Sequence, residues 1–222
     1  NLHTTVLGHT VSMPVGVSPT AMQRMAHPDG EIANAKVDTP LFGLRRADVR
    51  NKFTLPQHLR LANFEGLLSN KIHNSHQGSG LNEYVQNLFD KSLTWDEIKW
   101  LKSITNLPII AKGILRGDDA VKAIEAGCTA ILVSNHGARQ LDGVPSSIEA
   151  LPEIINAVKD YDVEVYLDGG VFIGRPALWG LTVGGEEGVK RVLDILRTEL
   201  EYTLQIAGTY KSYLFLLKRK PR

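Results

Sequence analysis

The repeated pairing of a short apolar run with an amphipathic helix is the feature that most constrains the fold of this chain. Apolar runs occupy residues 107–112, 130–134 and 163–167, and helices are expected between them at residues 118–126 and 147–159. Polar or glycine-rich residues follow each run. Such an order is typical of parallel βα units rather than of an antiparallel sheet. The sequence therefore predicts an α/β fold in which the two helices are crossovers.

Residue types at the helix ends support this order. Asp118 is expected to cap the helix at residues 118–126, and Gly127 to end it. Thr94 and Glu97 have the spacing of a capping box, so we expect a further helix to begin there. The apolar positions that we expect to face the core are Ile98, Leu101, Ile104, Ile148, Leu151, Ile155 and Val158.

We expect a single domain over residues 1–222. A hydrophobic content of 43% permits one sizeable core, and the length lies near the lower end of the roughly 200 to 400 residues typical of an α/β barrel. Residues 13–18 are expected to form the first strand and residues 186–206 the last helix. Residues 55–93 lack steady periodicity and are expected to form a loop or lid. Residues 209–222 are expected to be a diverged tail.

The charge balance limits the classes of partner. Lys and Arg number 25 against 24 Asp and Glu, so we expect neither nucleic acid nor membrane as a partner. The sequence has no apolar segment of bilayer length and no secretory signal, and a soluble protein is expected. Cys128 is the single cysteine and is expected to pack in the core. No metal site is expected, because His73 and His76 lack further ligands nearby.

One loop combines a base with an anion-binding cation. The apolar residues 130–133 lead directly into a segment that contains His136 and Arg139. Histidine exchanges a proton near neutral pH, and the guanidinium of arginine matches a carboxylate bidentately. This combination indicates a small organic acid as the substrate.

Six motifs occur in a fixed order along the chain. They are PTAMQ (19–23), VDTP (37–40), IAKG (110–113), SNHGARQLD (134–142), LDGGV (167–171) and IGRP (173–176). Together they resemble the FMN-dependent α-hydroxy acid oxidases, the glycolate oxidase group, over most of residues 5–208. The resemblance implies a (β/α)8 TIM-barrel fold. It is incomplete here, because five or six of the eight strands are recognisable.

The resemblance also implies roles for individual residues. His136 is expected to be the active-site base, and Asp38 to pair with it and stabilise the imidazolium. Arg139 and Arg45 are expected to hold the substrate carboxylate. Lys112 is expected to face the flavin ring, where a fixed positive charge stabilises the reduced form. The positions that the resemblance assigns to FMN are Pro19, Thr20, Ala21, Lys112, Ser134, Asp168, Gly169, Gly170, Gly174 and Arg175. The last four belong to the late loops of the barrel, which are expected to bind the phosphate.

The chain departs from the family pattern at two junctions. Phe172 stands where the family has a second phosphate-binding arginine. Only residues 168–172 separate Leu167 from Ile173, although a parallel crossover needs at least about 10 to 12 residues. We therefore expect that the two strands are not parallel neighbours and that residues 168–171 run on or turn tightly. At residues 34–36, several βα units of the family are missing. These losses predict that the chain holds FMN weakly.

The implied reaction is oxidation of a small (S)-2-hydroxy acid to the 2-keto acid, with O2 as acceptor and H2O2 as product. A quinone or cytochrome as acceptor is an alternative. A second is an internally deleted splice form or gene-model variant that is catalytically impaired and binds FMN poorly. A third is a phosphate-binding barrel of another family, such as a flavin-dependent isomerase. The resemblance implies a homotetramer and a peroxisomal location. A cytoplasmic location is the alternative, since the tail does not end in Ser-Lys-Leu.

Overall fold

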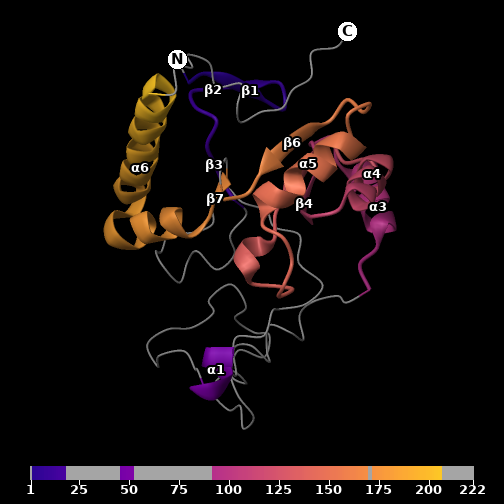
Figure 1. Ribbon diagram of the computed structural model, residues 1–222, viewed down its shortest axis with the longest axis horizontal. Helices are drawn as coiled ribbons and strands as arrows, with labels where there is room; N and C mark the ends of the chain where they lie inside the picture. The colour runs from indigo at the N-terminus through magenta and orange to yellow at the C-terminus, as the bar shows by residue number, and fades with distance from the viewer. Residues whose placement is uncertain (1, 19–45, 53–91, 170–171, 207–222) are drawn as a thin grey trace. The chain divides into compact units, whose positions relative to one another are not determined.

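The computed structural model describes four stretches of the chain, residues 2–18, 46–52, 92–169 and 172–206 (Figure 1). The chain divides into two compact units, and each is considered by itself. One unit comprises Asn1–Asn34 together with Thr94–Arg222, and the other comprises Ala35–Leu93. Helix α1 (Arg46–Arg50) belongs to the second unit. Most of the predicted loop or lid, residues 55–91, and the predicted tail lie outside the described residues.

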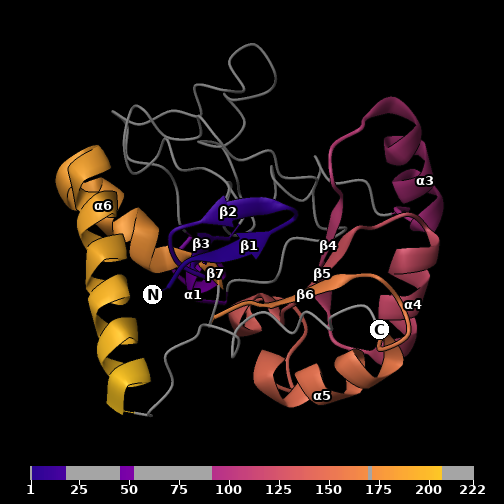
Figure 2. The same ribbon diagram turned by 90° about the horizontal axis from the view of Figure 1, so that it is seen from above.

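The first unit contains the strand and helix alternation that the sequence predicts. Its described elements are β1 (Thr4–Val6), β2 (His9–Val11), β3 (Gly16–Val17), α3 (Trp95–Ile104), β4 (Ile110–Ile114), α4 (Gly117–Glu125), β5 (Ala130–Val133), the short turn η4 (His136–Ala138), α5 (Ser147–Ala157), β6 (Glu164–Leu167), β7 (Phe172–Ile173) and α6 (Arg175–Ile206). Strands β4, β5 and β6 form a parallel sheet in that order, with α4 and α5 as the crossovers. Figure 2 shows α3, α4 and α5 along one side of this sheet.

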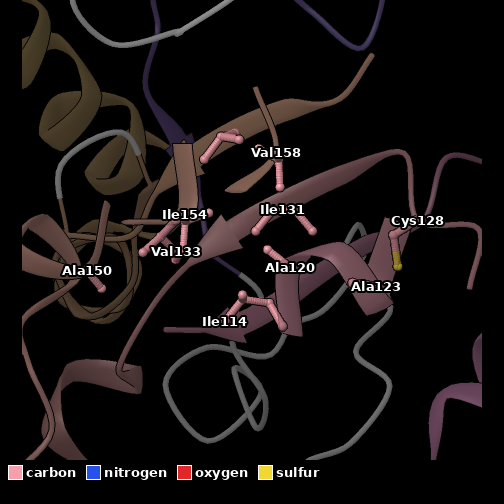
Figure 3. Packing of buried hydrophobic residues seen from close by; sticks show 10 residues of the cluster. Ile114, Ala120, Ala123, Cys128, Ile131, Val133, Ala150, Ile154 and Val158 are labelled. Atoms are coloured by element: carbon pink, nitrogen blue, oxygen red, sulfur yellow. The ribbon is translucent and has the colours of Figure 1, made fainter. Parts of the chain in front are cut away.

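The central strand β5 is buried on both faces, because it carries four consecutive apolar residues. Alternation along the strand sends Ile131 and Val133 to one face, where they pack against Ala120 and Ala123 of α4 and Ile154 of α5 (Figure 3). Complete burial of a side chain the size of Ile131 contributes roughly 1.5–3 kcal/mol. The sheet and its two crossover helices therefore form one packed core.

The opposite face of the sheet is covered by the N-terminal hairpin. Ala130, Leu132 and Tyr166 on this face pack against Val6 and Leu7 of the β1–β2 hairpin. Strands β1 and β2 are antiparallel. The amide of Leu7 donates to the carboxylate of Glu164 at 3.0 Å, and the Tyr166 hydroxyl donates to the same carboxylate. The hairpin is thus attached to the amino end of β6, away from the ends at which the sheet presents its polar residues.

The first and last parallel strands pair with each other. Gly16 of β3 lies opposite Phe172 of β7, and the amide of Ser18 donates to the carbonyl of Ile173 at 2.7 Å. A Cβ added at Gly16 would lie 2.9 Å from the Phe172 ring, so a larger residue there would require the ring to shift. A barrel sheet closes by pairing its first strand with its last.

Strands β6 and β7 lie in different sheets, as expected from the short connection. A parallel bridge joins Asp168, the residue after β6, to Phe172 of β7. Gly169 has φ +83°, and its amide donates to the Phe172 carbonyl at 2.9 Å. The described residues on both sides of positions 170 and 171 are therefore joined directly by hydrogen bonding.

Several predicted boundaries were wrong. Strand β4 starts at Ile110 rather than at residue 107, because Pro108 has no N–H to give to a ladder. Arg116, not Asp118, is the N-cap residue of α4, and its side chain makes no capping hydrogen bond. The Asp118 carboxylate instead accepts two hydrogen bonds from Arg116, at 2.9 and 3.0 Å. This pairing holds the pKa of Asp118 below its ordinary value.

The predicted buried positions of two helices were partly wrong. The capping box of Thr94 and Glu97 is confirmed, but Ile104 at the end of α3 is 61% exposed. In α5, Ile148 is 60% exposed, and the buried positions are Ala150, Ile154 and Val158. Apolar residues cover a wide part of the α5 surface, so either of two faces could pack on the sheet. The face with the small Ala150 does so, because it allows close approach. Packing rather than spacing decided the orientation.

Helix α6 begins at Arg175 and is broken at Gly184 and Gly185, so the expected start at residue 186 applies to its second segment alone. A Cβ added at Gly180 would lie 2.6 Å from the Gly188 carbonyl oxygen, and one at Gly188 would lie 1.9 Å from that of Gly180. The two segments therefore meet through two glycines. Leu193 and Leu200 of the second segment pack against Leu2, Met13 and Leu204.

Cys128 is buried, as predicted, and burial raises the pKa of its thiol. None of the helices within the described stretches has the length and apolar content that crossing a bilayer requires. Over the same residues, no group of three or more His, Cys, Asp or Glu side chains is placed to hold a metal ion. His73 and His76 lie outside the described residues.

Candidate active site

Four polar side chains meet where neighbouring parallel strands end. Lys112 is the middle residue of β4, Ser134 follows β5, Asp168 follows β6 and Ser18 follows β3. The Lys112 Nζ lies 3.0 Å from Ser134 Oγ and 3.0 Å from Asp168 Oδ2. The carboxyl ends of parallel strands share one edge of a sheet, which is where α/β barrels place their active sites.

Asp168 is the acceptor at the centre of this cluster. Its Oδ2 accepts from Ser134 Oγ at 2.5 Å, and its Oδ1 accepts from Ser18 Oγ at 2.6 Å. Burial alone raises the pKa of this carboxyl, but the hydrogen bonds from Ser134 and Ser18 and the charge of Lys112 outweigh burial and hold the pKa below its ordinary value. Asp168 is therefore ionised at neutral pH.

The side chains of Lys112 and Asp168 are 20% and 16% exposed. A charge pair at this depth is less screened by water than a surface pair. The cation of Lys112 and the carboxylate of Asp168 therefore lie side by side, together with serine hydroxyls, at the edge of the sheet. Such a group of donors and acceptors can bind a polar ring or a polyol chain.

Ser134 connects the cluster to the segment that carries the predicted base. The serine is 1% exposed, and its hydroxyl oxygen accepts from Lys112 Nζ and from the amide of His136 at 3.0 Å. The same hydroxyl donates to Asp168. Every hydrogen-bonding position of the Ser134 side chain is thus occupied by a neighbour.

His136 begins a left-handed turn. It has φ +57° and is half-buried, and Arg139, which follows the turn, is exposed. The Asn135 side chain accepts from the amides of Gly137 and Ala138, at 3.0 and 3.3 Å. The structure thus places the predicted base one turn away from Ser134, at the same edge of the sheet as Lys112 and Asp168.

Gly174 and Arg175 lie at the junction of β7 and α6. Arg175 is the first residue of α6, and a Cβ added at Gly174 would meet none of the described atoms within 4 Å. A helix N-terminus next to an arginine and open space suits an anion. The amide of Gly169 donates to Phe172, so this glycine makes its hydrogen bond within the chain.

The other predicted site residues lie outside the described residues. They are Pro19, Thr20, Ala21, Asp38, Arg45 and Gly170. Their assigned roles stay predictions.

Sequence reasoning missed two residues of this region, Ser18 and Asn135. Ser18 directly precedes the PTAMQ motif, and it is 5% exposed. A hydroxyl residue at the end of an apolar strand was the signal that could have found it. Asn135 lies inside a quoted motif, but only coordinates show which amides its side chain binds.

Comparison with known proteins agrees with this geometry. The family model for FMN-dependent dehydrogenases matches residues 1–37 and 34–213. Human 2-hydroxyacid oxidase 1 is 40% identical over 289 residues, which cover 94% of this chain and 78% of that protein. Glycolate oxidase 3 of Arabidopsis thaliana is 38% identical over 286 residues, covering 94% and 77%.

Solved structures with the same architecture include two oxidases. Mandelate oxidase in complex with (S)-4-hydroxymandelic acid superposes with a TM-score of 0.82 at 28% identity, covering 95% of this chain and 80% of that chain. A lactate oxidase from Pediococcus acidilactici gives a TM-score of 0.73 at 26% identity, covering 99% and 80%.

The fold and these relatives together define an oxidoreductase built on a TIM-barrel architecture. The chain belongs to the FMN-dependent dehydrogenase family. The expected fold class, the cofactor FMN and the reaction class, oxidation of a 2-hydroxy acid to a keto acid, are thereby confirmed. These relatives make an isomerase of another family a wrong alternative.

One predicted junction also agrees with the comparisons. The two matches to the family model meet at residues 34–37, where the sequence indicates missing βα units. The alignment with the human relative runs over 289 residues, although the chain has 222. The chain therefore lacks internal segments that this relative contains.

The described residues fit FMN in the chemistry of their donor set. Lys112, whose ammonium group is held by Ser134, suits the polar edge of a flavin ring, and Asp168 suits the hydroxyls of a ribityl chain. Gly174 and Arg175 suit the terminal phosphate. Phe172 supplies no phosphate contact, because its ring packs edge-to-face on Tyr166 with a centroid distance of 5.5 Å.

Proposed function

We propose that this chain oxidises a small (S)-2-hydroxy acid, that O2 is the electron acceptor and that H2O2 is the second product. The observation that carries the proposal is the meeting of Lys112 of β4 with Ser134 and Asp168, which follow β5 and β6, with the amide of His136 bound to Ser134. This arrangement provides a charged edge for a flavin and a base beside it.

In this proposal, His136 removes a proton from the substrate. Oxidation of a 2-hydroxy acid removes two electrons and two protons, from the hydroxyl group and from C2, so a base next to C2 is required. Asp38 then stabilises the imidazolium that His136 becomes. FMN, when bound, takes up the two electrons that O2 later receives.

Substrate orientation is the role proposed for the arginines. Arg139 and Arg45 bind the carboxylate, which fixes C2 relative to His136. Arg139 follows the turn of His136 in the chain, so the cation and the base are held by one short segment. Two guanidinium groups that each bind the carboxylate bidentately restrict rotation of the acid more than a single ammonium group would.

Lys112 is proposed to contact the flavin ring, with Ser134 beside it holding the ammonium group, and Asp168 is proposed to contact the ribityl hydroxyls. Gly174 and Arg175 are proposed to bind the phosphate at the start of α6. Pro19, Thr20, Ala21, Gly169 and Gly170 complete the set that the resemblance assigns.

The test is anaerobic reduction of FMN-reconstituted protein by glycolate or L-lactate, followed by admission of air. The proposal expects loss of the flavin absorbance, its return in air and one H2O2 for each keto acid. His136→Ala should slow the bleaching by about 10²- to 10⁴-fold or more, as expected for loss of a general base. Bleaching of the variant at the wild-type rate would remove His136 from the mechanism. Return of absorbance with a quinone but not with O2 would identify a different acceptor.

A second candidate is a catalytically impaired variant of the family. Phe172 in place of a phosphate-binding arginine and the missing units at residues 34–37 favour it. Purified protein that holds no FMN at micromolar concentration would support this candidate, whereas stoichiometric yellow protein after gel filtration would support the active oxidase.

Assembly and location belong to the proposal as well. A homotetramer is proposed from the family resemblance, and light scattering after gel filtration measures it. A peroxisomal location is proposed because the relatives include a peroxisomal (S)-2-hydroxyacid oxidase of Arabidopsis thaliana. Imaging of a fluorescent fusion would distinguish the peroxisome from the cytoplasm.

A further inference from the structure

The turn after β5 has an unfavourable backbone conformation. His136, Gly137 and Ala138 have φ values of +57°, +65° and +55°. Glycine adopts this region without cost, but residues with a Cβ rarely do so, and two of these three carry one. The turn therefore needs contacts from outside its own backbone to stay in this conformation.

Asn135 supplies contacts on the far side of the turn. Its Oδ1 accepts from the amides of Gly137 and Ala138, at 3.0 and 3.3 Å. Its Nδ2 donates to the carbonyl of Pro145 at 3.4 Å. Pro145 directly precedes Ser146, the N-cap residue of α5. One side chain therefore links the left-handed turn to the start of the next helix.

Ser134 supplies the contact on the near side. Its Oγ accepts from the amide of His136 at 3.0 Å. Two successive side chains thus bind the three successive amides of residues 136–138. Ser134 is also bound to Lys112 and Asp168, whereas the Asn135 side chain, among the residues that the structure describes, hydrogen-bonds to the turn and to Pro145. A change at Asn135 can disturb the turn and leave the flavin-facing cluster intact.

We infer that Asn135 is a positioning residue, which holds His136 and Arg139 in the geometry for substrate oxidation by fixing the left-handed turn. The inference rests on the proposed roles of His136 and Arg139. It separates two functions of the same segment. Ser134 serves the flavin side, and Asn135 serves the substrate side.

The variants follow from the contacts. Asn135→Ala removes both acceptor contacts, and Asn135→Asp keeps the acceptor oxygen. Ala138→Gly removes one of the two Cβ atoms that disfavour the turn, so the double variant Asn135→Ala/Ala138→Gly needs less support. Asn156→Ala, at an exposed position of α5, is the matched control for loss of an asparagine.

The measurements use the full chain with FMN added. For Asn135→Ala, kcat/KM for the 2-hydroxy acid should fall about 10- to 100-fold, the range for loss of two hydrogen bonds. The Kd for FMN, measured by quenching of flavin fluorescence, should stay within about 2-fold of wild type, and the Kd for oxalate, a probe of the carboxylate site, should rise about 10-fold. Asn135→Asp, compared on the plateau of its pH profile, should stay within about 3-fold of wild type. The double variant should regain about 5- to 10-fold in kcat/KM, since a left-handed residue with a Cβ is disfavoured by that order.

The outcomes separate this inference from the proposed function. If the wild-type chain oxidises the acid and Asn135→Ala does so with unchanged kcat/KM, the positioning role is overturned and the proposed function stands. An equal loss of FMN and oxalate affinity would also overturn it, because Asn135 would then support the whole site. Failure of Ala138→Gly to restore activity would reject the left-handed turn as the cause. A wild-type chain that fails to oxidise any 2-hydroxy acid overturns both.

Discussion

The hydroxyl of Ser18 donates to Asp168 Oδ1 at 2.6 Å and so joins two residues that are 150 positions apart in the chain. Ser18 directly follows β3, which pairs with β7, whereas Asp168 directly follows β6 of the three-stranded sheet. A parallel bridge between Asp168 and Phe172 also links the two sheets. The Ser18–Asp168 hydrogen bond therefore holds the β3–β7 pair against the larger sheet at the edge where the site lies.

Replacement of Ser18 by alanine should destabilise the protein by about 1.5–3 kcal/mol, the range for a hydrogen bond to a charged group. Asp168 would lose one of the donors that lower its pKa. Urea unfolding of the wild type and the variant measures the difference. Ser103→Ala is the control, because the Ser103 hydroxyl makes an exposed hydrogen bond to a helix carbonyl. Equal effects of the two substitutions would show that Ser18 does not join the sheets.

The lowered pKa of Asp168 predicts how stability depends on pH. A carboxyl whose folded-state pKa lies below the unfolded value binds fewer protons in the folded state, so its contribution to stability is present above the ordinary value of 3.8 and is lost as the pH falls through the folded-state pKa. Unfolding free energies measured from pH 6 down to about pH 2 should fall less steeply for Asp168→Asn than for the wild type. Parallel curves would exclude Asp168 as a source of the acid sensitivity.

The family resemblance of the motifs assigned Lys112, Ser134 and Asp168 to one site, and the structure brings their side chains together, although their roles stay predictions. The sequence could not predict that Ser18 joins them, since that pairing depends on the closure of β3 on β7. The sequence predicted a helix from residue 186 but not the helical segment that precedes Gly184 and Gly185 in α6. Glycine in a helical pattern is compatible with continuation, a kink or a stop, so it did not show that the helix begins earlier.

The meeting of the two segments of α6 depends on glycine at position 188. A Cβ there would lie 1.9 Å from the Gly180 carbonyl oxygen, so Gly188→Ala requires a backbone shift. We expect a loss of about 1–3 kcal/mol or more in the free energy of unfolding. Gly184→Ala is the matched control, since its Cβ would meet no described atom within 4 Å and its φ is −149°. In guanidinium unfolding, the free energy of unfolding of Gly188→Ala should be well below that of Gly184→Ala. Equal values would contradict the close approach of Gly188 to Gly180.

The proposed carboxylate contact of Arg139 predicts a selective effect of a conservative change. In Arg139→Lys the positive charge stays, but the bidentate fork is lost, so KM for the 2-hydroxy acid should rise by about 10-fold or more. The corresponding 2-hydroxy amide has no carboxylate and should be affected less. Steady-state kinetics with both substrates test this, and an equal loss for acid and amide would contradict the assignment.

Phe172 occupies the position at which the resemblance expects a phosphate-binding arginine, but restoring that arginine should not restore binding. The Phe172 ring packs edge-to-face on the buried Tyr166 and lies against Gly16 in the β3–β7 pair. Phe172→Arg would place a guanidinium among these apolar groups, and we expect a loss of about 3 kcal/mol or more in stability. Phe172→Leu keeps an apolar side chain and should cost less. FMN titration and urea unfolding of both variants test this, and tighter FMN binding by a stable Phe172→Arg protein would show that position 172 is free to turn toward the phosphate.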